Sequence, residues 1–132
     1  RLTFKGWLSA LEHGNMEAMI WQSIVASHST KFLTRFESKI PAWVQTGVEV
    51  NSLDGLKAII SQTHHDDPSD SMHHSRLSSM VGDKPVSVIG GSEDRLAPPE
   101  EVEHLARALK EGGASVQSTI FEAGHMIPIE QP

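Results

Sequence analysis

The chain has 132 residues, of which 38% are hydrophobic, and a formal net charge of −6. This length allows one modest domain, and an acidic chain without a clustered basic face argues against a nucleic-acid partner. The absence of cysteine excludes disulfides and thiol nucleophiles from these residues and suits a reducing compartment, so we expect a cytoplasmic location. No apolar run reaches the roughly 18 residues of a membrane span.

The first half of the sequence predicts a series of helices. Apolar residues recur at helical spacing in four segments, which cover residues 4–11, 16–24, 32–36 and 53–60. Gly14 is a stop signal for the first of them, and Asn15 can cap the second. We expect Ile40-Pro41 to break the third, because the residue before a proline disfavours helical geometry.

Residues 61–84 are polar and rich in Ser, Asp and His, which predicts a linker. The doublets His64-His65 and His73-His74 flank several aspartates, and imidazole and carboxylate groups suit zinc or nickel. Adjacent side chains diverge, however, and no known metal-ligand spacing is present. We therefore predict a solvated loop or one helix face here, and no metal site.

The last third predicts two strands around a helix, at residues 86–89, 99–111 and 115–121. Pro98-Pro99 and the two glutamates that follow favour a helix start, and Gly112 favours its end. If these elements form one βαβ unit, the strands are parallel and the crossover is right-handed. The loops that follow the two strands then leave the same edge of the sheet.

An acid and a histidine follow these two predicted strands. Asp94 ends the segment Gly91-Ser92-Glu93-Asp94, and His125 lies in Gly124-His125-Met126. Because neighbouring parallel strands are about 4.8 Å apart, Asp94 and His125 can meet. Such a meeting suits a histidine that acts as a general base and a carboxylate that orients it. Taken singly, Asp94 could be a turn or capping residue, and His125 could bond a turn carbonyl.

Neighbouring residues offer other interpretations. Glu93 is a rival acid, and Glu130 is expected to brace the histidine loop. Gly90-Gly91-Ser92-Glu93-Asp94 follows a strand as a nucleophile elbow does, but residues 96–99 delay the helix that an elbow enters directly. We therefore interpret Ser92 as an ordinary turn residue.

The pattern Gly91-x-x-Asp94-x-x-x-Pro98, then a helix, a strand and Gly124-His125 with Glu130 and Pro132 behind it, resembles the C-terminal end of an α/β-hydrolase. The resemblance covers residues 84–132 and is weaker over 1–83. It implies an α/β fold in which residues 1–83 are a helical cap and linker and residues 84–132 are the C-terminal part of the core. It also implies that Asp94 and His125 are two members of a Ser-His-Asp triad, with no cofactor.

The nucleophile of such a triad lies upstream of both residues, yet no Gly-x-Ser-x-Gly occurs in the sequence. The resemblance thus implies a nucleophile from outside these residues, in the N-terminal part of the same fold, supplied by the same protein or by a second chain. Alone, the segment is expected to be inactive.

The resemblance implies hydrolysis of a small-molecule ester or lactone, although an aspartate nucleophile would instead imply an epoxide hydrolase or dehalogenase. Trp21, Phe32 and Met126 are candidates for lining the substrate pocket, and ordinary core positions are the alternative for the aromatic residues. The alternative function is a non-catalytic ligand-binding protein or pseudoenzyme on the same scaffold, because fold does not fix function.

Overall fold

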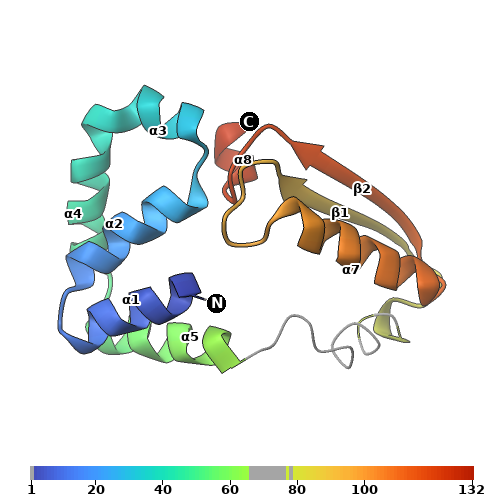
Figure 1. Cartoon of the computed structure of the whole chain (residues 1–132), viewed down its shortest axis with the longest axis horizontal. Coiled ribbons are helices and arrows are strands. Elements are labelled where there is room, and N and C mark those ends of the chain that lie inside the picture. Colours follow the sequence, from blue (N-terminus) through green and yellow to red (C-terminus); the bar gives the residue numbers. More distant parts are fainter. Residues whose placement is uncertain (1, 66–76, 78) are drawn as a thin grey trace. The chain divides into compact units, whose positions relative to one another are not determined.

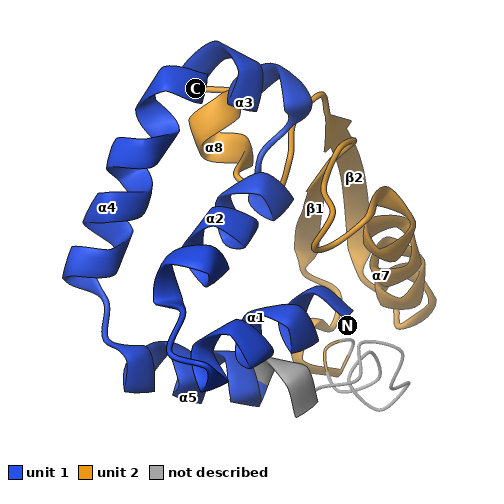
Figure 2. Cartoon of the chain, turned by 60° about the vertical axis from the view of Figure 1, so that its left-hand side comes forward, with its two compact units in different colours: residues 1–67 blue, residues 68–132 orange. Residues whose placement is uncertain are grey.

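A computed structural model describes residues 2–65, 77 and 79–132 of the chain. The chain divides into two compact units, residues 1–67 and residues 68–132 (Figure 2). The first unit contains only helices among its described residues, and the second contains the two strands.

Short helices build the first unit (Figure 1). Their bounds are α1 Leu2–Glu12, α2 Met16–Ser27, α3 Thr30–Phe36, the 3-10 turn η1 Glu37–Lys39, α4 Ile40–Val50 and α5 Leu53–His65. Two local signals separate α1 from α2 as expected. Gly14 has a φ of 74°, and the Asn15 side chain accepts a hydrogen bond from the Ala18 N–H at 2.9 Å, which satisfies one of the orphan amides of α2.

The core of the first unit lies where α1 meets α2 and α5, and where α2 meets α4. Its buried side chains come from all four of these helices, and they are Trp7, Leu11, Met19, Ile20, Ala26, Ile40, Val44 and Ile60. α4 approaches α2 closely at Gly47, where a Cβ atom would lie 3.1 Å from Ile20 Cγ2. The apolar stripe predicted for the first helix therefore faces this core.

The helix α4 was not expected from the sequence. Ile40-Pro41 does end the preceding helical segment, but Pro41 lies in the first turn of α4 and begins a new helix. Proline is tolerated there because its missing N–H would have no partner inside the helix anyway. A second difference is that α5 continues to His65, several residues into the predicted linker.

The second unit is the predicted βαβ unit (Figure 1). Its elements are β1 Pro85–Gly91, α7 Pro99–Glu111, β2 Ser115–Phe121 and the short helix α8 Ile127–Glu130. β1 and β2 pair in parallel, from Pro85 opposite Ser115 to Gly91 opposite Phe121. The expected strands, helix and parallel pairing are confirmed, and the chain is a mixed α/β structure with a two-stranded sheet.

The helix α7 covers one face of this sheet with its apolar stripe. Val102, Ala106 and Leu109 are buried against Val88 of β1 and Ala114, and Gly90 leaves room for Val102. Parallel sheets need such cover because both of their faces tend to be buried. The register of β1 and β2 beneath α7 in turn decides which residues emerge together where the strands end.

Leu109→Ala is expected to destabilise the second unit by about 2–5 kcal/mol, because the buried leucine leaves a cavity that the structure fills only in part. Leu109 is 2% exposed, whereas Leu105 on the same helix is only partly buried and provides a matched control. Urea unfolding followed by circular dichroism measures both losses. Equal losses for the two variants would contradict this packing.

Candidate active site

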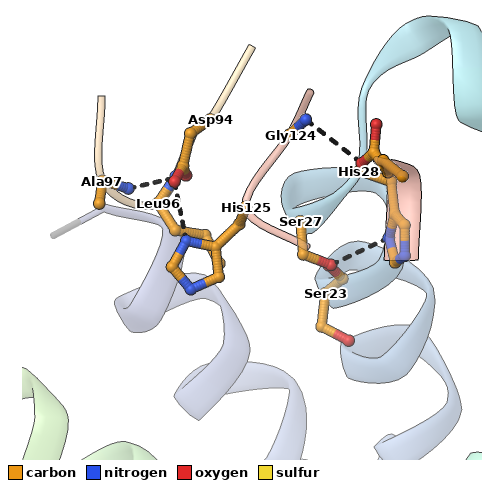
Figure 3. Close-up of polar contacts among 9 residues, drawn as sticks. Ser23, Ser27, His28, Asp94, Leu96, Ala97, Gly124 and His125 are labelled. Atoms are coloured by element: carbon orange, nitrogen blue, oxygen red, sulfur yellow. Dashed lines mark hydrogen bonds and ion pairs between the residues drawn. The ribbon is translucent and has the colours of Figure 1, made fainter. Parts of the chain in front are cut away.

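The loops that follow β1 and β2 bring Asp94 and His125 into direct contact (Figure 3). His125 Nδ1 lies 2.8 Å from Asp94 Oδ2, a short hydrogen bond between side chains 31 residues apart in sequence. The predicted meeting of these two side chains is thus confirmed. It follows from the parallel pairing, because both strands end at the same edge of the sheet.

The two oxygens of the Asp94 carboxylate have separate partners. Oδ1 accepts hydrogen bonds from the N–H groups of Leu96 at 2.8 Å and Ala97 at 2.9 Å, and Oδ2 faces His125. A side chain that is 4% exposed needs such donors, because an unpaired buried carboxylate is costly. Asp94 is therefore a turn-forming residue through Oδ1 and a histidine partner through Oδ2, so the two interpretations are compatible.

Backbone hydrogen bonds tie the acid loop to the histidine loop. The Ser92 N–H donates to the Phe121 carbonyl at 2.8 Å, and the Glu93 N–H donates to the Ala123 carbonyl at 2.9 Å. These bonds carry strand pairing past the end of the sheet. The distance between Asp94 and His125 is thereby set by the main chain as well as by their own contact.

The loops approach so closely that one position has no room for a side chain. A Cβ atom at Gly91 would overlap the carbonyl oxygens of Ala123 and Gly124, which are main-chain atoms and cannot rotate away. Position 91 therefore requires glycine for steric reasons. Its φ is not positive, so left-handed geometry is not the reason.

The His125 ring is oriented for proton transfer. A carboxylate oxygen can only accept, so Nδ1 carries the proton in this contact and the neutral ring has its lone pair on Nε2. The side chain is 46% exposed, in contrast to its buried partner. A half-exposed imidazole held by a buried carboxylate can take a proton from a hydroxyl group and return it.

The structure agrees with the interpretation of Ser92 as a turn residue. β1 ends at Gly91, a turn follows at residues 92–93, and α7 begins only at Pro99. A nucleophile elbow would pass directly from strand to helix, with its next N–H directed at the substrate. The Glu93 N–H instead donates to Ala123. His125 bonds Asp94, so Glu93 is not the acid of this contact.

The predicted substrate-binding residues lie in both units. In the first, Trp21 on α2 is 36% exposed, and the Phe32 ring on α3 stacks on His28 with ring centroids 4.7 Å apart. In the second, Met126 directly follows His125 and is partly buried. Their role in binding stays a prediction.

A second serine and histidine pair, in the first unit, was not expected from the sequence. Ser27 Oγ lies 3.2 Å from His28 Nδ1 (Figure 3). It donates its proton, however, to the Ser23 carbonyl at 2.6 Å. His28 Nδ1 also lies 3.0 Å from the Ile24 carbonyl, which only accepts, so this nitrogen carries the proton. The contact therefore satisfies carbonyls at the end of α2 and does not activate the serine.

The sheet of the second unit also carries a pocket away from Asp94 and His125. A polar pocket of about 230 Å³ lies at the amino ends of the two strands, lined by Pro85–Ser87 and Ser115–Gln117. It is at the opposite end of the strands from Asp94 and His125, and ligands of open α/β sheets usually bind at the carboxyl ends.

Within residues 2–65, 77 and 79–132, no helix is long and apolar enough to span a membrane.

The histidine doublets lie largely outside the described residues. His73-His74 belongs to the segment that the structure does not describe, and of His64-His65 only the backbone is described, as the end of α5. Among the described residues, no group of three or more His, Cys, Asp or Glu could hold a metal ion. The prediction about the doublets thus stays a prediction.

Comparison of the sequence with protein-family models and with curated proteins found no match. The local chemistry of Asp94 and His125 is therefore what supports a function for this chain. That chemistry is a buried, fully engaged carboxylate and an exposed imidazole that share one short hydrogen bond.

Proposed function

We propose that Asp94 and His125 are the acid and the base of a Ser-His-Asp triad that hydrolyses an ester-type bond in a small molecule, as a carboxylesterase or lactonase does. The observation that carries this proposal is the 2.8 Å contact between a 4% exposed carboxylate and a 46% exposed imidazole. A general base must be within reach of the group whose proton it takes, and a half-exposed imidazole meets that requirement. The resemblance of residues 84–132 to the end of an α/β-hydrolase supports the same reaction.

The nucleophile is proposed to come from outside these 132 residues, because the sequence has no Gly-x-Ser-x-Gly and Ser92 lies in a turn. It belongs to the N-terminal part of the same fold, in the same protein or in a second chain. The serine attacks the ester carbonyl carbon while its proton passes to His125 Nε2. Asp94 holds the ring and stabilises the imidazolium, but does not itself take the proton.

The second half of the reaction reuses the same two residues. His125 returns the proton to the departing alcohol oxygen, which leaves an acyl-enzyme. It then takes a proton from water as the water attacks the acyl carbon, and finally restores the serine. A positioned base of this kind contributes about 10²–10⁴ in rate.

Asp94→Asn in the full-length natural protein tests the proposal. We expect turnover of a p-nitrophenyl ester to fall on the order of 10⁴-fold, because an amide nitrogen facing Nδ1 would favour the wrong imidazole tautomer. Glu93→Gln changes the neighbouring acid in the same loop and should leave turnover unchanged. Initial rates measure both effects.

Two outcomes would count against the proposal, the first against the role of Asp94 and the second against hydrolysis. Turnover that Asp94→Asn leaves within about threefold of the wild type would remove the carboxylate from the mechanism. A full-length protein that binds esters or lactones without cleaving them, with Gly or Ala at the nucleophile position, would favour the ligand-binding alternative.

A further inference from the structure

The short helix α8 contacts the backbone that carries His125. The Gly124 N–H donates to Glu130 Oε1 at 3.2 Å, and this bond spans the start of α8, since Gly124 precedes that helix and Glu130 ends it. Gln131 Nε2 donates to the Glu122 carbonyl at 3.0 Å, so neighbouring side chains hold both ends of the same loop. The expectation that Glu130 braces the histidine loop is thereby confirmed.

The peptide groups before His125 are held from several sides. The Gly124 N–H meets Glu130, the Ala123 carbonyl accepts from Glu93, and the carbonyls of both residues lie against the bare Cα of Gly91. Ala123 is fully buried, which leaves this segment little freedom. Gly124 is the last residue before His125, so rotation of its backbone would swing the imidazole ring directly.

The ring itself has few other restraints among its described contacts. It is held at Nδ1 by Asp94, and nearly half of the side chain is exposed to solvent. One hydrogen bond sets the distance to the carboxylate, but it leaves the ring able to pivot about that bond. The backbone that carries His125 therefore contributes to the direction of Nε2.

We propose that Glu130 is a positioning residue for His125, which directs Nε2 by accepting the hydrogen bond from the Gly124 N–H. The part of this inference that concerns turnover rests on the proposed function. It does not make Glu130 a catalytic residue, because its described contact is with the backbone and not with the ring. What Glu130 contributes is alignment, and a misplacement of about 1 Å at a reacting group can cost on the order of 10² in rate.

Two variants separate the accepted hydrogen bond from the negative charge. Glu130→Ala removes the acceptor, whereas Glu130→Gln keeps an oxygen that can accept from Gly124. Glu122→Ala is the matched control, because it removes an exposed carboxylate from the same loop and leaves the Glu122 carbonyl in place for Gln131. Thermal unfolding of each variant reports whether the fold survives.

In the 132-residue chain, the readout is nuclear magnetic resonance of the Gly124 amide and of the His125 Nδ1 proton. We expect Glu130→Ala to speed Gly124 amide exchange by about tenfold or more and to broaden or shift the Nδ1 signal. Glu130→Gln and Glu122→Ala should keep both signals close to those of the wild type. Unchanged signals in Glu130→Ala would overturn the inference.

In the full-length protein, Glu130→Ala should lower kcat for a p-nitrophenyl ester by about tenfold to a hundredfold and leave KM within about twofold. Glu130→Gln should restore kcat to within about threefold of the wild type. If Glu130→Gln is as slow as Glu130→Ala while both are folded, charge and not the hydrogen bond matters, and the inference is wrong. If Glu130→Ala does not fold, Glu130→Met takes its place in both measurements, because methionine keeps the length of the side chain but offers no oxygen to the Gly124 N–H.

Failure of the proposed function would look different. If the wild type cleaves no ester even with the part that carries the nucleophile present, hydrolysis is refuted, yet the resonance signals still show whether Glu130 aligns His125. Conversely, an active wild type whose Glu130→Ala variant keeps its kcat and its Gly124 protection refutes only the positioning role.

Discussion

Replacement of His125 by alanine in the full-length protein is expected to abolish hydrolysis of a p-nitrophenyl ester, with a loss on the order of 10⁴-fold or more. The loss should be this large because a serine hydroxyl without a base is a weak nucleophile at neutral pH. Stability should fall only modestly, since the side chain is 46% exposed and Asp94 keeps the two hydrogen bonds that its Oδ1 accepts from Leu96 and Ala97. Initial rates and circular dichroism measure the two effects.

His104→Ala is the control for this prediction, because His104 is an exposed histidine on α7 in the same unit. Its loss should leave the rate unchanged. A His125→Ala enzyme that retains a rate within about tenfold of the wild type would show that another group is the base. A second measurement, labelling of the nucleophile by a fluorophosphonate, should weaken in parallel with the rate, because the same base activates the hydroxyl.

Gly91→Ala is expected to destabilise the second unit by about 3 kcal/mol or more, the upper end of the cost of overpacking. The added methyl group would meet the carbonyls of Ala123 and Gly124, so relief requires the two loops to separate. Separation would break the hydrogen bonds from Ser92 and Glu93 and would move Asp94 away from His125. Activity should therefore fall with stability.

Two other glycine substitutions provide a graded control. At Gly90 the new Cβ would lie 2.6 Å from Val102 Cγ2, a side-chain atom that can shift, so we expect a loss of about 1–3 kcal/mol. At Gly6, inside α1, the nearest atom is Gln22 Oε1 at 3.7 Å, and alanine should stabilise the helix by about 0.5–1 kcal/mol. Urea unfolding orders the series. Gly91→Ala at or above wild-type stability would contradict the close approach of the loops.

The structure also explains why one residue can satisfy two opposed interpretations. An aspartate in a turn is commonly explained by local hydrogen bonds, and Asp94 makes them with the N–H groups of Leu96 and Ala97. Those bonds use one oxygen and orient the other toward His125. Local turn chemistry thus positions the carboxylate, and the parallel strands bring the histidine to it.

Much of the second unit was predictable because its signals are local. Pro98-Pro99 with the glutamates after it, the glycines at 112–113 and the β-branched runs predicted the helix and both strands, and the structure places them at Pro99–Glu111, Pro85–Gly91 and Ser115–Phe121. The meeting of Asp94 and His125 followed from one topological rule, that parallel strands end at the same edge.

Other features were decided by the tertiary structure alone. The helix α4 escaped prediction because Pro41 is both a helix breaker and a good first-turn residue, and packing of Ile40 and Val44 in the core favours the second role. The exposure of Trp21 is a further case, since an apolar side chain does not itself say which face of a helix is covered.

What the residues alone determined is therefore the order of elements, which depends on short-range conformational preferences. They also determined the pairing of an acid with a histidine, which follows from that order and from the rule that parallel strands end at the same edge. What only the folded chain decided is how that pair is held: the division of work between the two Asp94 oxygens, the bare Cα of Gly91 and the reach of Glu130 to Gly124. The physical reason is that hydrogen bonds and close contacts depend on distances of a few tenths of an ångström between loops. Sequence spacing does not specify such distances.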